Sequence, residues 1–441
     1  MTADTIAAIA TPSGVGGIGV LRLSGINAHA IGKAIAGEVP PAGEFSYRCF
    51  QDLNGNEIDQ GIVLCFSSPS SFTGEDVIEL QGHGGPVPMA MLLDACIQAG
   101  ARRAEPGEFS QRAFLNDRID LAQAEAITDL INSATEQAAR SAVRSIKGAF
   151  SDHVQGLEQE LIRFRMYIEA AIDFPEEEID FLADKGIMSR LKNIKTQLKQ
   201  ILERANAGEL LQHGVQIALV GEPNVGKSSL FNALIGSEAA IVTEIPGTTR
   251  DVIAQSINLD GLLIHLMDTA GIRKSEDVVE KIGIDRARQA LASADLVLEL
   301  RDSTIKKSKK LITSGTETNK VLTVYTKTDL INTAKTSNEN EIRVSSKTGQ
   351  GIPGLIQRIK EEVGFSIATA SAFSARKRHI SLLQSTFLAV ERGENELIAA
   401  GAGELLAEEL RLAHNTLGEI TGKMTADDLL GEIFSSFCIG K

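Results

Sequence analysis

The chain has little of several residue types that mark particular classes of protein. It contains no Trp, and aromatic residues make up 4% of its 441 residues. This scarcity disfavours a protein that binds single strands by stacking bases on aromatic side chains. The cysteines are Cys49, Cys65, Cys96 and Cys438. Their spacing fits no metal site, and so few cysteines in so long a chain do not make a disulfide framework.

Two kinds of hydrophobic segment are also missing from the sequence. The N-terminus lacks the basic region and apolar run of a secretory signal, and no apolar stretch reaches the roughly 20 residues that span a bilayer. We therefore expect a cytoplasmic protein without membrane insertion. The hydrophobic content of 43% and charged content of 23% are typical of globular proteins, and the length predicts two or three domains.

Positive charge is in deficit. The chain has 44 Lys and Arg residues against 58 Asp and Glu residues, so its formal net charge is −14. A protein that grips nucleic acid by itself is usually basic, because neutralised phosphates supply most of the affinity. If RNA is a substrate, a partner or a local basic patch must help to hold it.

The residue pattern changes along the chain. Residues 1 to 117 combine Gly and Pro with short apolar runs, which predicts short strands, turns and one or two helices. Over Ile119–Ile168 apolar residues recur every three or four positions, which indicates a long amphipathic helix that bends or breaks at Gly148 and Gly156. A second helical stretch is predicted for Met188–Leu211.

Between Val215 and Val363 strand candidates alternate with helical patterns, which predicts a mostly parallel sheet covered by helices. The chain is helical again after Ser366. The simplest architecture is an α/β domain inserted between two halves of one helical domain, since adjacent halves would share a core that neither could bury alone. The strand candidates are Gln216–Val220, Val252–Leu259, Leu262–Met267, Asp295–Leu300, Val321–Tyr325 and Ile342–Val344.

The strongest motif is a phosphate-binding loop. The pattern G-x-x-x-x-G-K-S runs from Gly221 to Ser228, after a predicted strand and before the helix-like segment Ser229–Ile235. Backbone N–H groups of such a loop and of the helix N-terminus hold phosphate oxygens. Lys227 would reach the outer phosphates, and the Ser228 hydroxyl would coordinate Mg²⁺.

Four further motifs follow in the order of a GTP-binding domain. Asp268–Gly271 ends a predicted strand, where its carboxylate can hold Mg²⁺ through water and its glycine N–H can sense the γ-phosphate. Gly247–Asp251 lies where a switch loop supplies a hydroxyl to Mg²⁺. Thr326–Asp329 follows a strand, and Asp329 can accept hydrogen bonds from guanine N1 and N2, a pattern that adenine does not present. Ser345–Lys347 supplies the last base contact.

Two departures from the usual motifs affect the expected chemistry. Thr326 stands where the base-recognition motif usually has Asn, which favours weaker nucleotide affinity with guanine selection kept; loss of that selection is the alternative. Ile272 stands where Ras-like proteins have the Gln that orients the attacking water. Arg250 is more often structural than an arginine finger, so hydrolysis needs another positive charge. An acid of the second switch could position the water, and Glu276, Asp277 and Glu280 are available.

The sequence resembles the MnmE, or TrmE, family of tRNA-modification GTPases over essentially all its residues. The most specific matches are the segments Ala10–Pro12 to Ser24–Gly25, Gly74–Asp76 to Gly82–Pro86, Pro106–Phe109 to Asp120–Glu125, and Phe437–Lys441. The resemblance implies a multidomain fold of mixed α/β and all-α parts. It comprises an N-terminal α+β domain for tetrahydrofolate binding and dimerisation (1–118), a discontinuous helical domain (119–212 and 367–441) and an inserted Ras-like P-loop GTPase domain (213–366).

The resemblance also implies an activity and partners. Members of this family form homodimers and act with the flavoprotein MnmG (GidA), in a heterotetramer or larger complex. Together they install an aminomethyl or carboxymethylaminomethyl group on the wobble uridine, position 34, of certain tRNAs. Their GTPase domains dimerise with K⁺ bound, which activates hydrolysis of GTP, and 5-formyl- or 5,10-methylene-tetrahydrofolate binds the N-terminal domain.

Site residues carry over by position. The matched GTP-binding residues are Asn224, Val225, Gly226, Lys227, Ser228, Ser229, Thr243, Glu244, Ile245, Pro246, Gly247, Thr248, Thr249, Asp268, Thr269, Ala270, Gly271, Lys327, Asp329, Ser345, Ser346 and Lys347. The K⁺ ligands would be Asn224, Thr243, Ile245 and Thr248, the Mg²⁺ ligands Ser228 and Thr249, and the catalytic residues Glu280 and Cys438. The folate contacts would be Arg22, Glu79, Lys441 and Arg118, which replaces an expected Lys.

Other interpretations of these residues stay open. Glu280 taken alone is more often a solvated helix charge, and Cys438 is equally well an inert buried thiol. A ribosome-assembly GTPase would share the GTPase domain but should carry a basic RNA-binding appendage. A folate-dependent one-carbon transferase with a regulatory GTPase domain is the third hypothesis.

Overall fold

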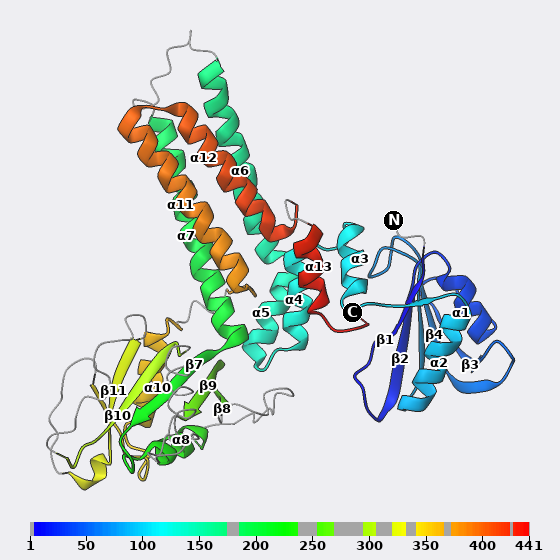
Figure 1. The fold of residues 1–441 in the computed structure, drawn as a ribbon, viewed down its shortest axis with the longest axis horizontal. Helices are drawn as coiled ribbons and strands as arrows, with labels where there is room; N and C mark the ends of the chain where they lie inside the picture. Colours follow the sequence, from blue (N-terminus) through cyan, green and yellow to red (C-terminus); the bar gives the residue numbers. More distant parts are fainter. Residues whose placement is uncertain are drawn as a thin grey trace, which may run out of the picture. The chain divides into compact units, whose positions relative to one another are not determined.

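The computed structural model describes residues 4–173, 185–236, 254–268, 294–305, 320–331, 341–365, 372–423 and 427–440. Contacts within the chain divide it into two compact units. The first comprises Met1–Thr128, Ile146–Ile187 and Leu388–Lys441, and the second comprises Asp129–Ser145 and Met188–Phe387. Figure 1 shows both units, coloured along the sequence.

The first unit contains a six-stranded sheet of order β3-β4-β5-β2-β1-β6. Neighbouring strands are antiparallel except β1 and β6, which are parallel. The strands are β1 (Ile6–Ile9), β2 (Gly16–Ser24), β3 (Phe45–Gln51), β4 (Glu57–Phe66), β5 (Val77–Gly84) and β6 (Arg102–Arg103). Short apolar runs broken by Gly therefore form strands in this region, as the sequence predicts.

Two helices complete the core of this sheet. Helix α1 (Ala28–Ala36) buries Ile31 and Ile35. Helix α2 (Pro86–Gln98) begins with a proline. Proline suits this position because the N–H group that it lacks would have no hydrogen-bond partner in the first turn of a helix. Their buried residues join those of the strands in one apolar cluster with Leu21, Leu23 and Leu80. Arg22 of β2 and Glu79 of β5 lie opposite each other in the register of these two strands, and both are half-buried.

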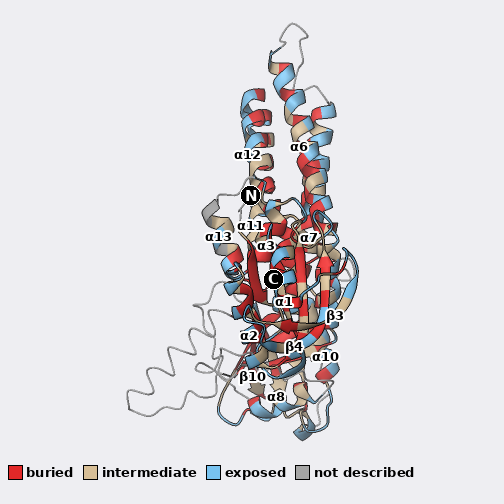
Figure 2. Cartoon of the chain, turned by 90° about the vertical axis from the view of Figure 1, so that its right-hand side faces the viewer, coloured by how far each residue is buried: buried red, intermediate tan, exposed pale blue. Residues whose placement is uncertain are grey.

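Two long helices pack together in the first unit. Helix α6 (Ala149–Asp173) packs along α12 (Gly403–Thr421), and both alternate buried and exposed faces in Figure 2. The buried residues that repeat at helical spacing are Val154, Leu157, Leu161, Phe164 and Ile168 on α6, and Leu406, Leu410, Ala413 and Leu417 on α12. Two helices whose midpoints lie about 250 residues apart in the sequence thus pack through one apolar interface.

The long helix predicted from the sequence is interrupted at Gly148 but continues through Gly156. Gly148 has φ +91° and lies between α5 (Glu136–Ile146) and α6, which favours glycine because other residues rarely adopt that conformation. Gly156 lies inside α6, so the break expected there is wrong. A further gap that we did not predict separates α4 (Leu121–Ile131) from α5.

Three shorter or boundary helices remain. Helices α3 (Glu108–Leu115) and α13 (Asp427–Ser435) belong to the first unit and pack on each other. Helix α11 (Lys377–Ala400) runs across the boundary of the two units. None of the helices formed by the described residues is long and apolar enough to cross a membrane.

The second unit contains another six-stranded sheet, of order β12-β11-β10-β7-β9-β8. All its neighbours are parallel except the hairpin of β8 and β9. The strands are β7 (Val215–Gly221), β8 (Ala254–Leu259), β9 (Leu262–Asp268), β10 (Leu296–Asp302), β11 (Lys320–Thr326) and β12 (Glu341–Arg343). Each of these strands, as the structure describes it, begins and ends within one or two residues of its predicted range.

Helices α8 (Lys227–Ile235) and α10 (Ile352–Glu362) pack on this sheet, and both contribute to its apolar core. Helices α7 (Lys185–His213) and α5 belong largely to the same unit. Arg144 of α5 donates to the carbonyl oxygen of Ala372, and Ser374 and Arg376 bond the buried carboxylate of Asp129. The mixed α/β and all-α class predicted from the sequence is confirmed.

Candidate functional site

The phosphate-binding loop connects the middle of the parallel sheet to a helix. Strand β7 ends at Gly221, and α8 begins at Lys227 after Gly226, whose φ is +104°. Asn224 also has a positive φ, +63°, and its side chain is exposed. These turns let the chain reverse tightly, so that the first N–H groups of α8 are open to an anion.

The lysine of this loop folds back over the loop itself. The Lys227 side chain is 9% exposed, and its Nζ donates to the carbonyl oxygens of Gly221 at 2.6 Å and Glu222 at 3.0 Å. An ammonium group held there keeps positive charge against the loop where phosphate oxygens bind. The neighbouring hydroxyls of Ser228 and Ser229 are exposed on the first turn of α8.

The predicted base-recognition residues follow β11 and β12 at the carboxyl edge of the same sheet. Lys327 Nζ pairs with Asp302 Oδ2 at 2.7 Å. Burial would raise the pKa of Asp302, but hydrogen bonds from Lys327 and Thr304 outweigh it and lower that pKa. Asp329 is exposed on a 3-10 turn, and Ser345 Oγ donates to its Oδ1 at 2.7 Å. The turn thus fixes the carboxylate while leaving it accessible to a base.

The base-recognition segment and the phosphate-binding loop touch directly. Thr326 ends β11 and is 2% exposed. Its Oγ1 lies 2.6 Å from the carbonyl oxygen of Val225 in the phosphate-binding loop and 3.2 Å from that of Arg301 on β10. The residue that departs from the usual motif therefore still joins the two loops.

Several predicted residues lie outside the described part of the chain. They are Thr243, Glu244, Ile245, Pro246, Gly247, Thr248, Thr249, Thr269, Ala270, Gly271, Glu280 and Lys441. Asp268 is described only as the last residue of β9. The structure thus brings together the phosphate-binding loop and the base-recognition residues, and the roles given to both switches stay predictions.

A second candidate site lies on the antiparallel sheet. Arg22 of β2 faces Glu79 of β5 in register, and their side chains pair at 2.8 Å. The guanidinium of Arg22 also lies 5.8 Å from the ring centre of Phe72 and 5.7 Å from that of Phe109. The carboxylate and the two aromatic rings thus hold the guanidinium of Arg22 in a fixed orientation.

The C-terminal segment reaches this sheet. Arg22 Nη1 donates to the carbonyl oxygen of Gly440 at 3.4 Å, and Gly107 N–H donates to that of Cys438 at 3.3 Å. A side chain at position 440 would collide with the backbone of Ile9 and Ala10, and its φ of +92° also favours glycine. The glycine of the terminal motif is therefore needed for close approach to β1.

A cavity of about 880 Å³ opens beside this segment. It is lined by the loop from Thr11 to Gly16, by Met89 and Leu93 of α2, and by Cys438. Cys438 is exposed, whereas Cys65 and Cys96 are buried. Cys438 is therefore not buried, contrary to the alternative interpretation, and it is one of the residues that line the cavity.

Arg118, another predicted folate contact, lines a different cavity from the one beside the terminal segment. Arg118 is exposed and follows α3, where its side-chain carbons pack near Gly74. It lines a separate cavity of about 470 Å³ together with Asp120, Gln123 and Lys423. The structure thus places the pair of Arg22 and Glu79 in contact with the terminal segment through Gly440, and it places Arg118 at a separate cavity.

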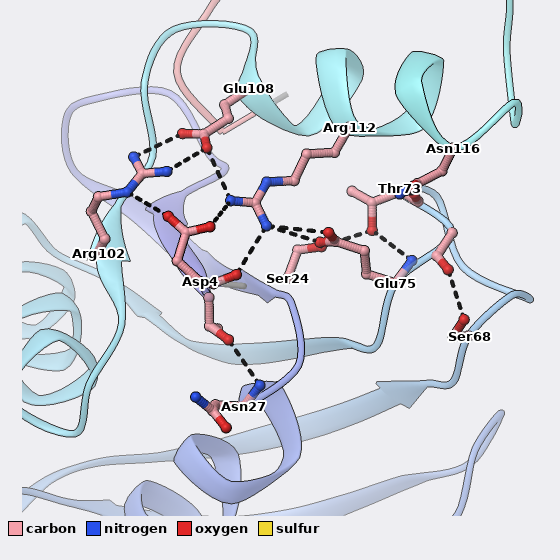
Figure 3. Close-up of polar contacts among 12 residues, drawn as sticks. Asp4, Ser24, Asn27, Ser68, Thr73, Glu75, Arg102, Glu108, Arg112 and Asn116 are labelled. Carbon is pink, nitrogen blue, oxygen red and sulfur yellow. Dashed lines mark hydrogen bonds and ion pairs between the residues drawn. The ribbon is translucent and has the colours of Figure 1, made fainter. Parts of the chain in front are cut away.

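Sequence reasoning missed a cluster of charged residues built around the buried Arg112 (Figure 3). Arg112 of α3 is 4% exposed, and its guanidinium contacts Asp4, Glu75 and Glu108 at 2.8 to 3.1 Å. Arg102 adds bonds to Asp4 at 2.8 Å and to Glu108 at 2.6 Å. Two arginines and three carboxylates thereby connect the segment before β1, the loop before β5, β6 and α3.

This pairing sets the protonation of the acids. Burial would raise the pKa of Glu108, but hydrogen bonds from Arg102, the Glu105 amide and Arg112 hold that pKa below its usual 4.5. The same opposition lowers the pKa of Asp4, whose partners are Arg102 and Arg112. Glu108 and Arg112 stand four residues apart on a helix, and that spacing was the one signal of the cluster in the sequence.

Two protein-family models match the chain. The model described as "GTP-binding protein TrmE N-terminus" matches residues 5–118, and the model described as "MnmE helical domain" matches residues 121–438. The second match includes the phosphate-binding loop and spans more than half of the chain. Together the two models account for both sheets and for the helices that follow them.

Curated relatives match along the full length. A protein named tRNA modification GTPase MnmE from Pseudomonas aeruginosa is 50% identical, and one of the same name from Coxiella burnetii is 52% identical. Each alignment covers 99% of this chain and 99% of the relative. Among solved structures, a variant of Era from Aquifex aeolicus bound to GDP and AlF₄⁻ is 23% identical over 40% of this chain and 66% of that chain, with a TM-score of 0.27.

Proposed function

The chain belongs to the MnmE family of tRNA modification GTPases, and from this premise we propose that it hydrolyses GTP as a step in the modification of tRNA. The observation that carries the proposal is the loop from Gly221 to Lys227, which leads from a central strand into a helix N-terminus with Lys227 folded over it. The relatives' names favour tRNA modification over the alternative of ribosome assembly.

In the proposed site, backbone N–H groups at the start of α8 bind the phosphates and Lys227 neutralises the outer ones. The exposed Ser228 hydroxyl on the first turn of α8 is the kind of hard oxygen donor that Mg²⁺ prefers. Ser228 and Thr249 would hold Mg²⁺, with Asp268 acting through water. The metal would neutralise charge that develops on the β- and γ-phosphates.

Guanine selection is assigned to Asp329. Asp329 is exposed, and its carboxylate accepts a hydrogen bond from the Ser345 hydroxyl, which fixes the orientation of the carboxylate. Lys327, Ser346 and Lys347 would complete the surroundings of the base. Because a carboxylate accepts from the two donors of guanine N1 and N2, GTP should bind in preference to ATP.

The positive charge for hydrolysis is assigned to K⁺. Asn224 sits exposed in the phosphate-binding loop with a φ of +63°, where its amide oxygen can serve as a ligand. Thr243, Ile245 and Thr248 would supply the other ligands when two GTPase domains pair. The cation would then stabilise the charge of the transition state, as an arginine finger does, which contributes a factor of about 10³–10⁵ to the rate. Glu280 would position the attacking water.

The antiparallel sheet is proposed as a tetrahydrofolate site. Arg22 and Glu79 form an oriented ion pair next to the terminal segment, and the adjacent cavity of about 880 Å³ exposes Cys438. Arg118 and Lys441 would add cationic contacts to the ligand. This site would supply a one-carbon unit, in 5-formyl or 5,10-methylene form, to the uridine chemistry, and Cys438 would take part in that chemistry.

The proposed assembly is a homodimer that works with the flavoprotein MnmG on the wobble uridine of tRNA. The net charge of −14 supports a partner, because an acidic chain needs help to hold RNA. A one-carbon transferase with a merely regulatory GTPase domain remains the competing function, since the exposed Cys438 lines a cavity.

The direct test is turnover of GTP and ATP by the purified chain in K⁺ and in Na⁺ at rising protein concentration. We expect hydrolysis of GTP over ATP, faster in K⁺, with a specific rate that rises as domains pair. Asn224→Ala should lose the K⁺ effect and keep nucleotide binding. Equal turnover in both cations would refute the cation assignment, and failure to hydrolyse GTP in either would refute the function.

A further inference from the structure

Thr326 occupies a tightly fixed place between two loops. Its backbone carbonyl oxygen accepts from Ser303 Oγ at 2.5 Å and from Ser303 N–H at 3.2 Å. Its position in β11 pairs with Asp302 of β10. Since the backbone is held from both sides and the side chain is 2% exposed, the hydroxyl has little freedom to turn elsewhere.

One hydroxyl faces two carbonyl oxygens. Oγ1 lies 2.6 Å from the oxygen of Val225 and 3.2 Å from that of Arg301, but a threonine hydroxyl carries a single hydrogen. The shorter distance gives that hydrogen to Val225. The Arg301 oxygen then faces a lone pair of Oγ1 and gains no donor from it.

A carboxamide at this position would differ in one respect. Asn has nearly the volume of Thr, but its NH₂ group carries two hydrogens and could donate to both carbonyl oxygens. The side chain also has room on one side, because the Cβ position that Gly226 lacks is 3.8 Å from the nearest Thr326 atoms. Thr326 therefore makes one bond where the usual residue can make two.

We propose that Thr326 is a positioning residue that joins the phosphate-binding loop to the base-recognition turn by a single hydrogen bond, and that this single bond sets a weakened affinity and fast release for GDP and GTP alike. The inference rests on the proposed function. Val225 precedes the loop glycine that leads to Lys227, and Thr326 precedes Lys327 and Asp329. The bond thus links both halves of the nucleotide site.

Selectivity for guanine is assigned elsewhere. Asp329 is oriented by Ser345, which follows β12, whereas the Thr326 hydroxyl is directed at the carbonyl oxygens of Val225 and Arg301. A change at Thr326 should therefore alter the affinities for GDP and GTP by the same factor. The preference of the site for guanine over adenine nucleotides should stay as it is.

The test measures equilibrium binding and release of fluorescent GDP and of a non-hydrolysable GTP analogue, with Mg²⁺ present, in full-length variants. Thr326→Asn should tighten both nucleotides about fivefold, mainly through slower release, since a net hydrogen bond is worth roughly that factor. Thr326→Val, which keeps the shape but removes the hydroxyl, should weaken both by about fivefold or more. Thr326→Ser keeps the hydroxyl and should match the wild type.

Thermal unfolding of the nucleotide-free variants separates affinity from stability. If Thr326→Val does not fold, Thr326→Ser tests the role of the hydroxyl in its place. A Ser variant that binds nucleotide more weakly than the wild type overturns the inference. An Asn variant that releases GDP as fast as the wild type also overturns it. A wild type that binds no guanine nucleotide contradicts the proposed function instead, so the two failures are distinguishable.

Discussion

In the antiparallel sheet, charged side chains from distant parts of the chain converge. Arg112 pairs with three carboxylates, which come from the segment before β1, the loop before β5 and α3. In the parallel sheet, the candidate site is made mainly of backbone turns at the ends of strands, with Lys227 bonded to two carbonyl oxygens. The first site depends on side-chain charge balance, whereas the second depends on loop shape. Substitutions should therefore damage the two in different ways.

The largest effect on this comparison should come from Lys227→Ala. Removing the cation over the phosphate-binding loop should lower the GTP turnover rate by about 10²–10³, as loss of one preorganised electrostatic group does in other enzymes. The measurement is phosphate release in K⁺ with saturating Mg²⁺. The folate binding proposed for the antiparallel sheet should stay unchanged in the same variant. A loss of folate binding there as well would mean that the two sites are not independent.

The second largest effect should come from Arg112→Met. This change leaves Asp4, Glu75 and Glu108 without their buried partner and should destabilise the sheet by about 3 kcal/mol. Because a chain of several domains has no single unfolding free energy, the readout is amide hydrogen exchange of β1 and β2 in denaturant. Arg140→Met is the matched control, since Arg140 pairs with Glu136 on an exposed helix face and should cost well under about 1 kcal/mol.

The third prediction separates the two proposed folate arginines. Arg22→Ala should weaken binding of 5-formyltetrahydrofolate by about tenfold or more, because it removes a charge-assisted contact and the bond to Gly440. Arg118→Ala should weaken it less, since Arg118 is exposed and lines a different cavity. Calorimetry on both variants measures the two losses of folate affinity. A larger loss for Arg118→Ala would place the folate site at the cavity that Arg118 lines and not at Arg22.

The smallest effect is a change in acid sensitivity. The pKa of Glu108 is lowered by folding, so its carboxylate contributes stability above pH 4.5 that is lost as the pH falls through its folded value. Glu108→Gln cannot titrate, so exchange protection of β1 and β2 should fall less steeply from about pH 4.5 downward. The pKa of Asp302 is also lowered, and Asp302→Asn should flatten the same profile only in β10 and β11.

The parallel sheet was largely predictable because its central strands β7 and β10 are mostly buried and carry apolar runs, such as Ile217–Val220. The phosphate-binding loop was predictable because its residues are adjacent in sequence. The cluster around Arg112 was not, because Asp4 and Glu75 reach it only through tertiary folding. The gap between α4 and α5 was also missed, since apolar spacing continues across it.

The measurement that tests the account most directly is the content of modified wobble uridine in tRNA from cells whose only copy of this chain is wild type or Asp268→Ala. Nucleoside mass spectrometry should find the modification with the wild type and its loss with Asp268→Ala, because GTP hydrolysis is proposed to drive it. Arg140→Met should behave as the wild type. Normal modification with Asp268→Ala would contradict the account.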